Sequence, residues 1–416
     1  MILSEWRRFR KNTDVPFYCN PFQLFFAVWA LMLACFQVRV SYTSYPYFST
    51  AFYLFASSAC SFLAGYATVR LAYFSIGHYP VGPNSYRIDI SKLRRFHLGA
   101  IIVTLAIMLM NLKLFGLPPL FGFLGADTLN YQEYGSLRQV LFPAILVLFV
   151  SAPLEVSIPR RWALYLYAPA CFLIYGSRGY LLIMLFQALV VFSLKTTLSQ
   201  KKIYLVAAAT LGAAVLLANL IGNTRNSLGS EALLLGMRIK HSYYDWPAAY
   251  LWVLSYISTP LSNLCWIVHV YPYDHPSFNF LYSALPGFWA PKSLEISDLG
   301  SEQIVDGVHT YISKYFIDFW VFGIFGINYV WGLIAGFISA GNRLTRNYLT
   351  SAVLLGCMGF MFFSDFLTIL IILLELLALG WAQRYFTIEG NEGTEGHTTA
   401  PTRAHRVRIV ASSNEI

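Results

Sequence analysis

Long apolar runs alternate with short polar stretches along most of the chain. Each run has roughly the 15 to 25 residues with which an α-helix crosses the hydrocarbon core of a bilayer. The pattern predicts membrane spans at about residues 22–38, 47–69, 98–115, 140–157, 162–176, 179–194, 203–221, 316–341, 348–363 and 366–384. The sequence therefore predicts an all-α polytopic integral membrane protein with about 10 to 12 transmembrane helices.

The apolar stretch from residue 162 to residue 194 is interrupted near its middle by Gly176-Ser177-Arg178-Gly179. A single helix of this length would measure about 48 Å, whereas the hydrocarbon core is about 30 Å thick. We therefore expect two helices that turn at these four residues. Arg178 would then lie at the depth of the lipid phosphates on the non-cytoplasmic face.

Basic residues indicate the orientation of the spans. The chain of 416 residues is 57% apolar and 12% charged, with a formal net charge of +9. With a cytoplasmic N-terminus, most of the 29 lysines and arginines fall in cytoplasmic loops and tails, as the positive-inside rule requires. We therefore expect both termini in the cytoplasm, membrane lipids around the spans, and no nucleic acid partner, since orientation already explains the basic excess.

The predicted spans belong to one transmembrane domain, residues 1–388, and the polar residues 389–416 are expected to form a disordered cytoplasmic tail. A large non-cytoplasmic segment, about residues 222–314, contains apolar stretches at about 248–269 and 278–290 that prolines interrupt. Broken backbone is tolerated at membrane depth only where protein or water lines it. We expect interfacial or re-entrant helices there, and two further spans are the alternative.

The ordinary enzyme signatures are missing from the sequence. The six cysteines occur singly and lack the spacing of zinc ligands. No GxSxG, HExxH, Walker or Rossmann glycine pattern occurs. We therefore expect neither a metal site nor a cofactor.

Two arginines on the non-cytoplasmic face are candidates for anion binding. Arg178 lies in the turn described above, and Arg225 follows the span that ends near residue 221. A guanidinium group binds phosphate through two parallel hydrogen bonds and remains charged, so two arginines suit a diphosphate. The alternatives are an interfacial anchor for Arg178 and a solvated loop residue for Arg225.

Three further residues on this face could carry chemistry. Arg238 is expected near the end of an interfacial helix that Ser230 caps. His309 follows an acidic loop and could accept a proton, because an imidazole titrates near neutrality; the alternative is a hydrogen-bonding loop residue. Asp318 begins a span, where an ionisable residue is a functional candidate, with Lys314 or an arginine as its expected partner.

Several short motifs occur along the chain in a characteristic order. They are "FGLPPLFG" (115–122), "GSRGYLL" (176–182), "GNTRNS" (222–227), "YISTPLSNL" (256–264), "LPGF" (285–288) and "HTYISKYFIDF" (309–319). In this order and topology they resemble the bacterial O-antigen polymerase family, the oligosaccharide repeat unit polymerases. The resemblance covers about residues 20–385. The chain departs from the family where it reads Asp318-Phe319-Trp320, since the family often has Asp-Phe-Gly.

The resemblance implies a metal-independent glycosyltransferase on the periplasmic face of the bacterial inner membrane. A growing glycan on undecaprenyl diphosphate would be transferred to the non-reducing end of a new lipid-linked repeat unit. Arg178 and Arg225 would bind the diphosphate, and His309 would be the base. The residues that would contact sugar or support the site are Arg238, Tyr256, Asn263, Thr310 and Asp318. A chain-length regulator could be a further partner.

Two other functions remain open from the sequence. An O-antigen ligase would use the same lipid diphosphate donor but deliver the glycan to the lipid A core. A flippase for lipid-linked oligosaccharides would need polar residues through the middle of its spans, whereas residues 98–112, 140–154 and 203–218 contain no charge. Only Glu375, inside the last span, favours the flippase, and a buried packing role is its alternative.

Overall fold

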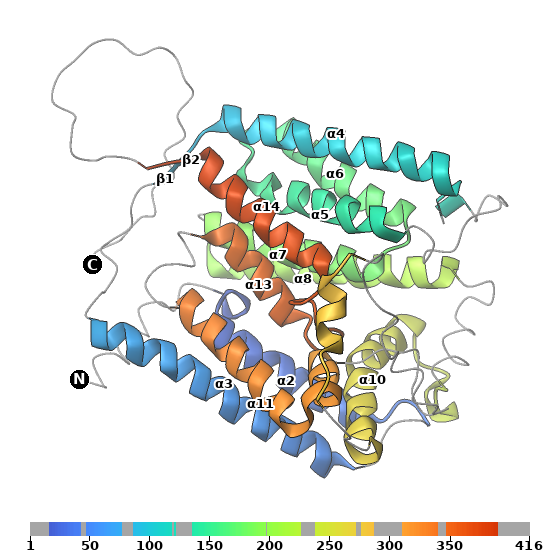
Figure 1. Cartoon of the computed structure of the whole chain (residues 1–416). Coiled ribbons are helices and arrows are strands. Elements are labelled where there is room, and N and C mark those ends of the chain that lie inside the picture. The colour runs from blue at the N-terminus through green and yellow to red at the C-terminus, as the bar shows by residue number, and fades with distance from the viewer. Residues whose placement is uncertain are drawn as a thin grey trace, which may run out of the picture.

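The computed structural model describes residues 16–42, 47–76, 86–118, 120–121, 135–196, 198–225, 238–271, 276–286, 310–339 and 347–389. These residues form a helical bundle (Figure 1). Its α-helices are α2 (Pro21–Val38), α3 (Phe48–Ile76), α4 (Ile90–Phe115), α5 (Gly135–Ser151), α6 (Ile158–Ile174), α7 (Arg178–Lys195), α8 (Gln200–Arg225), α10 (Ala248–Val270), α11 (Tyr311–Ser339), α13 (Tyr348–Gly359) and α14 (Leu370–Phe386). Shorter elements are the 3-10 helices η1 (Phe17–Cys19), η4 (Ala152–Leu154), η5 (His241–Tyr243) and η6 (Asn279–Ala284), and the strands β1 (Tyr86–Ile88) and β2 (Thr387–Glu389).

Six helical segments of the described chain are long and apolar enough to cross a membrane. They are Pro21–Val38, Phe48–Ser75, Ile90–Phe115, Leu137–Leu154, Ala248–Val270 and Tyr311–Ser339. The exterior of α4 is apolar, with Leu98, Ile102 and Leu109 all more than half exposed. Large apolar side chains in such numbers on a helix surface suit lipid rather than water. The helical membrane class predicted from the sequence is therefore supported.

Each predicted span coincides with one α-helix, but the boundaries between the last two differ. The sequence predicted spans at 348–363 and 366–384, whereas α13 ends at Gly359 and α14 begins at Leu370. The residues between them form a turn-rich connection, which we call the 360–369 loop. Its apolar residues continue the hydrophobic pattern, so hydropathy alone placed the boundary too close to Asp365.

Local chemistry explains where several helices begin and end. The Asn20 side chain accepts hydrogen bonds from the first amides of α2, and Asp89 does the same for α4. Helix α6 ends where Gly176 adopts a φ of 64°. The Gly176 amide donates to Leu173 and the Ser177 amide to Phe172, the hydrogen-bond pattern of a Schellman motif. The predicted division into two helices at this turn is confirmed.

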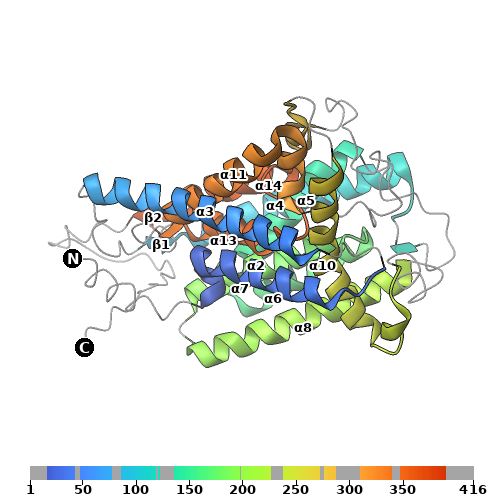
Figure 2. The ribbon, with the colours of Figure 1, turned by 90° about the horizontal axis from the view of Figure 1, so that it is seen from below.

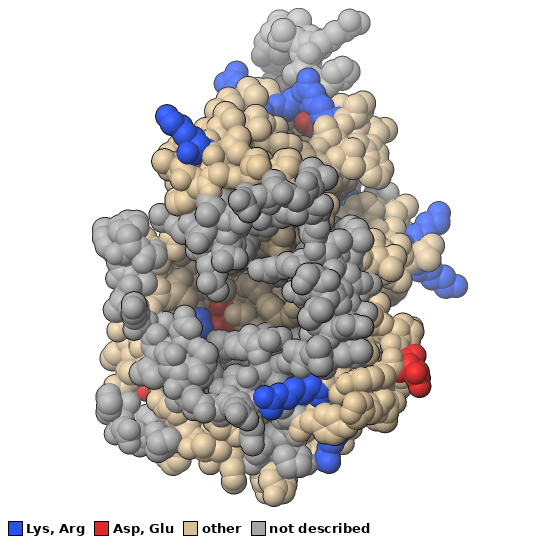
Figure 3. Space-filling model, turned by 90° about the vertical axis from the view of Figure 1, so that its right-hand side faces the viewer, with Lys and Arg blue, Asp and Glu red and all other residues tan. Residues whose placement is uncertain are grey.

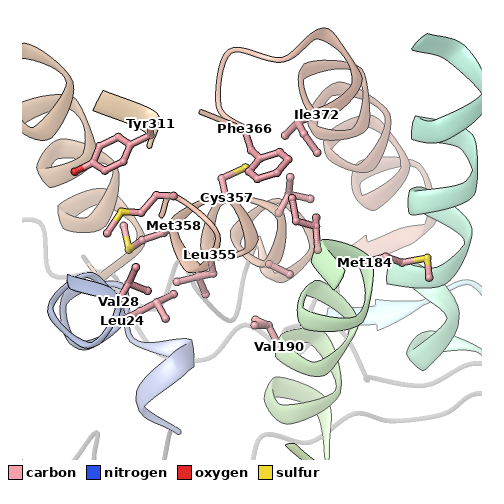
Figure 4. Packing of buried hydrophobic residues seen from close by; sticks show 14 of the residues in the cluster. Leu24, Val28, Met184, Val190, Tyr311, Leu355, Cys357, Met358, Phe366 and Ile372 are labelled. Carbon is pink, nitrogen blue, oxygen red and sulfur yellow. The ribbon is translucent and has the colours of Figure 1, made fainter. Parts of the chain in front are cut away.

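Helix α13 lies inside the bundle. In Figure 4, Leu355 and Met358 of α13 face Leu24 and Val28 of α2, while Cys357 lies beside Phe366 of the 360–369 loop. All of these side chains are almost completely buried. Burial of this kind stabilises by about 1.5–3 kcal/mol for each large apolar side chain.

Helices α3 and α11 approach so closely that glycine is required where they cross. A Cβ atom on Gly65 would lie 2.1 Å from the carbonyl oxygen of Tyr329, and one on Gly332 would lie 2.1 Å from that of Phe62. No side chain fits between these backbones. The hydroxyl of Ser61 donates to the Phe325 carbonyl across the same contact, at 2.5 Å.

Backbone pairing places two pairs of segments that are distant in sequence side by side. Strands β1 and β2 are antiparallel, so the start of α4 lies beside the end of α14. Ser41, after α2, forms an antiparallel bridge with Ile239, before α10. Helix α10 itself is continuous through Pro260. Figures 1 and 2 show it running steeply across the direction of α8.

Candidate functional site

The 360–369 loop is the point at which several predicted site segments meet. Its only acidic residue, Asp365, is 1% exposed. Oxygen Oδ2 of Asp365 accepts a hydrogen bond from the Tyr315 hydroxyl of α11 at 2.9 Å and another from the Thr368 hydroxyl. Oxygen Oδ1 is also buried, and no described residue donates a hydrogen bond of ordinary geometry to it.

A second buried acid, Asp318, fastens η6 to α11. Its carboxylate accepts hydrogen bonds from the Ser277 hydroxyl and from the Phe280 amide, the latter at 2.7 Å. Its carbonyl accepts from the Ser277 amide at 3.0 Å. Lys314, one helical turn earlier, interacts electrostatically with both Asp365 and Asp318. Within the described residues, however, no lysine, arginine or histidine side chain forms an ion pair with Asp318 within 4 Å. Its hydrogen-bond partners are the Ser277 hydroxyl and the Phe280 amide rather than the expected cation.

The position where the chain departs from the Asp-Phe-Gly pattern has an unusual backbone. Trp320 adopts φ 54° and ψ −137°, which breaks α11 into Tyr311–Phe319 and Val321–Ser339. A positive φ favours glycine, because any Cβ atom crowds the backbone there. The two parts then pack closely, since a Cβ on Gly323 would lie 1.9 Å from the Tyr315 carbonyl oxygen. Position 320 therefore has a backbone conformation that favours glycine, although the residue there is tryptophan.

Aromatic contacts join the beginning of α7 and the middle of α10 to the 360–369 loop. A Cβ on Gly179 would lie 3.7 Å from the Phe363 ring. The Tyr180 and Phe366 rings are 6.3 Å apart, and those of Tyr256 and Phe363 are 5.4 Å apart. The first turn of α7 and the face of α10 that carries Tyr256 therefore both lie beside the loop that contains Asp365.

Two of the predicted supporting residues also belong to this region. Thr310 is buried, its hydroxyl lies 3.3 Å from that of Ser313, and the next amide, of Tyr311, donates to the Met361 carbonyl. Asn263 is buried two helical turns after Tyr256, on the same side of α10. Of the predicted sugar-contacting set, Tyr256, Asn263, Thr310 and Asp318 are thus placed on the elements that surround the loop.

Arg238 lies apart from this group. Its side chain is exposed, its φ is 45°, and its carbonyl accepts hydrogen bonds from the Tyr42 amide and the Ser41 hydroxyl. Among the described residues no contact connects its side chain with Asp365 or Asp318. Ser230 to Met237, over which the interfacial helix before Arg238 was predicted, lie outside the described residues.

The structure places the backbones of the two expected phosphate-binding arginines. Arg178 is the first residue of α7, and Arg225 is the last residue of α8. Neither side chain is among those the structure describes, and His309 lies outside the described residues. The first turn of α7 has no side-chain cap from Ser177, and amides at the start of a helix favour anions.

Asp365 is the residue that sequence reasoning missed. It is a single acid between two apolar runs that together contain only one other charged residue before the C-terminal end of α14, Glu375. An ionisable side chain in such surroundings is a functional candidate by the same argument that selected Asp318. The signal was present, but Asp365 lies between the spans predicted at 348–363 and 366–384 and was not among the predicted site residues.

The molecular surface is hollowed on one face. Figure 3 shows acidic and basic side chains next to each other inside this hollow, and the face is the one at which α10 lies in Figure 1. Within the described residues, no group of three or more His, Cys, Asp or Glu side chains is placed to hold a metal ion.

No family model, curated protein or solved structure matches this chain. Its function must therefore be inferred from the residues and their geometry.

Two other buried polar groups have structural partners. Glu375 of α14 is fully buried, and its Oε2 accepts a hydrogen bond from the side-chain amide of Gln187 at 3.3 Å, while its Oε1 has no partner among the described residues. Near the start of α4, Arg94 binds Glu155 with two hydrogen bonds, of 3.3 and 3.0 Å. Burial by itself raises the pKa of Glu155, but the hydrogen bonds from Arg94 and the Ser157 amide outweigh it and hold the pKa below its ordinary value.

Proposed function

We propose that the protein is an O-antigen polymerase of the bacterial inner membrane. It transfers a growing glycan from undecaprenyl diphosphate to the non-reducing end of a new lipid-linked repeat unit, on the periplasmic face. The observation that carries the proposal is the meeting of the "GSRGYLL", "YISTPLSNL" and "YISKYFIDF" segments around the 360–369 loop. Motifs from three separate helices that meet at buried charged residues favour a substrate site over a packing role.

The proposed topology has ten crossings, with α10 and η6 on the periplasmic side. Among the described residues between Ser41 and Ile239, which are paired, the α-helices are α3 to α8, an even number. Among the described residues between the paired strands β1 and β2, the number of helices that cross is even only if α10 does not cross. The direction of α10 across α8 in both views supports an interfacial position (Figure 2).

The reaction forms a bond between the acceptor hydroxyl oxygen and the anomeric carbon of the donor sugar. The bond from that carbon to the diphosphate oxygen breaks, and its electron pair leaves with the diphosphate. Arg178 and Arg225 supply positive charge for the departing diphosphate. The uncapped first turn of α7 adds backbone amides at the same place. Binding both lipid-linked substrates in one site supplies orientation, and a chain-length regulator would act from outside this site.

The buried position of Glu375 supports a polymerase over a flippase. A transport path needs polar side chains that face a route across the membrane. Glu375 instead accepts a hydrogen bond from Gln187 inside the helix bundle and is fully buried. The Glu375 side chain therefore contacts Gln187 of helix α7 rather than a route across the membrane.

Complementation of a gene deletion tests the proposal. The host deletion is restored with wild type, Arg178→Ala, Arg225→Ala or His309→Ala at equal membrane expression, and lipopolysaccharide is separated on a gel. We expect the deletion and both arginine variants to leave core that carries a single repeat unit. Arg160→Ala is the matched control, because this exposed arginine begins α6 at the opposite end from the α7 turn; it should restore the full ladder.

Other outcomes contradict specific parts of the proposal. Loss of every repeat from the core in the deletion strain favours a ligase or a flippase. Normal ladders from both Arg178→Ala and Arg225→Ala reject the diphosphate site. A normal ladder from His309→Ala removes that histidine as the base.

A further inference from the structure

Asp365 has one carboxylate oxygen fixed and the other open. Tyr315 and Thr368 donate to Oδ2, while Oδ1 is buried without a hydrogen bond of ordinary geometry from any described residue. Buried carboxylate oxygens almost always have a donor, and an unsatisfied one costs about 1–3 kcal/mol or more. Glu375 also has one such oxygen, Oε1, but it lies within α14 and its side chain faces α7. Asp365 lies in the connection where several predicted site segments meet, so its orphaned oxygen indicates a ligand that donates a hydrogen bond.

The neighbours of Asp365 hold it rigidly. The Ser283 hydroxyl of η6 lies 3.2 Å from the Thr368 hydroxyl, and the Tyr315 ring packs 5.1 Å from that of Phe280. Both donors to Oδ2 are thus supported by η6 in turn. A carboxylate that is fixed through one oxygen presents the other in a defined direction, as a positioned acid or base requires.

Asp318 provides an internal comparison. It is equally buried and also lies near Lys314, but both its carboxylate and its carbonyl are engaged by Ser277 and Phe280. These hydrogen bonds give Asp318 a structural role, which is to hold η6 against α11. Only Asp365, of the two, keeps an oxygen for an external donor.

The electrostatic surroundings suit a carboxylate that exchanges a proton. Burial raises the pKa of Asp365, and the hydrogen bonds from Thr368 and Tyr315, the charge of Lys314 and the Leu367 amide oppose this rise. A raised pKa brings a carboxylate closer to the operating pH, where general bases work best. The Lys314 amine lies near the carboxylate, which favours a hydroxyl donor over a metal ion as the ligand.

We propose that Asp365 Oδ1 binds the attacking hydroxyl of the acceptor glycan and takes its proton. This inference rests on the proposed polymerase function. As the acceptor oxygen bonds to the anomeric carbon, its proton passes to Oδ1, and the electron pair of the broken bond leaves with the diphosphate. Asp365 is then a catalytic residue, and Tyr315 and Thr368 are positioning residues that act through it.

A reconstituted assay tests this role. Purified wild type, Asp365→Asn, Asp365→Glu and Asp318→Asn are placed in vesicles with lipid-linked repeat units extracted from the deletion strain, and polymer is measured on gels. We expect Asp365→Asn to slow polymerisation by about 10²–10⁴-fold, with unchanged binding of the repeat units. Asp365→Glu should recover part of the rate. A rate for Asp365→Asn within about threefold of wild type overturns the inference.

The pH profile separates catalysis from a structural role. The wild-type rate should decline on the acid side at a pH above that at which an ordinary carboxyl titrates, because Asp365 must be ionised to accept the proton. Tyr315→Phe removes a hydrogen bond that favours the ionised form, so the acid limb should move to higher pH. If the acid limb of the pH–rate profile is the same in Tyr315→Phe and wild type, the inference is overturned, even if Asp365→Asn fails to fold.

The same assay distinguishes two failures. If wild type forms no polymer from these units and the deletion strain retains its ladder, the proposed function itself is wrong. If wild type polymerises and Asp365→Asn does so equally while His309→Ala does not, the polymerase stands and Asp365 is not the base.

Discussion

Gly323 lies directly against the backbone of Tyr315, so that a Cβ at position 323 would be 1.9 Å from the Tyr315 carbonyl oxygen. This contact closes the break in α11 and holds the turn that carries Asp318 against the second part of the helix. The close approach explains why the chain needs glycine at position 323, three residues after the break.

Gly323→Ala should therefore destabilise the fold strongly. The added carbon meets backbone, which cannot rotate away, so we expect a loss of about 3 kcal/mol or more in the free energy of unfolding. Melting of the detergent-purified protein measures it. Gly326→Ala is the matched control, because nothing lies within 4 Å of its added Cβ. Equal melting temperatures for the two variants would refute this packing.

Trp320→Gly should be more stable than Trp320→Ala. Position 320 has φ 54°, where glycine is unstrained and every other residue is crowded. Both variants lose the same tryptophan side chain, so the difference between them isolates the backbone conformation. We expect a difference of about 1 kcal/mol in favour of glycine. A lower melting temperature for Trp320→Gly would show that the break does not depend on this backbone angle.

Asp318→Asn should loosen η6 without loss of the main bundle. The carboxylate accepts hydrogen bonds from the Ser277 hydroxyl and the Phe280 amide, and an amide nitrogen in place of one oxygen would face a donor. We expect a cost of about 1–3 kcal/mol, together with faster hydrogen exchange at residues 277–284. Asp245→Asn, at an exposed site, is the control. Identical exchange in both variants would contradict the fastening role.

The Arg94–Glu155 pair predicts a double-mutant cycle. Arg94→Met leaves a carboxylate whose side chain is 1% exposed without its cation, whereas Arg94 itself is 41% exposed, so solvent weakens the pair. We expect Arg94→Met to cost about 1–2 kcal/mol and the additional Glu155→Gln to recover much of it. If the losses in the free energy of unfolding from Arg94→Met and from Glu155→Gln simply add in the double variant, the two side chains are not coupled.

The same pair predicts a pH dependence. Because the folded pKa of Glu155 is lowered, its contribution to stability is present above the ordinary carboxyl pKa of about 4.3 and is lost as pH falls through the lowered value. Melting temperatures of wild type and Glu155→Gln should therefore converge at acid pH. A constant difference across this range would contradict the assignment.

Cysteine labelling tests whether α10 crosses the membrane. Tyr244→Cys precedes α10 and Phe278→Cys follows it, and both positions are exposed. An impermeant maleimide should label both from the side opposite to Ile158→Cys, at the exposed start of α6. Labelling of positions 244 and 278 from opposite sides would show that α10 crosses. The exposed native Cys60 is first replaced by serine.

Hydrophobic periodicity and length were sufficient to predict the helices. Runs of apolar residues long enough for the bilayer must form helices, because every backbone amide needs a partner there. The turn at Gly176 was also predictable, since a helix through residues 162–194 would exceed the hydrocarbon thickness. The connection around Asp365 was not, because four phenylalanines in residues 360–366 continue the apolar pattern without forming helix.

The sequence by itself determined the helical membrane class and the approximate positions of the helices, because these depend on local apolar length and on turn chemistry such as that of Gly176. Only the tertiary structure decided which polar residues share a site. Asp365 and Tyr315 are 50 residues apart, and Asp318 and Ser277 are 41 apart. Their contacts depend on how α11, η6 and the 360–369 loop pack, and packing of this kind leaves no periodic signal in the chain.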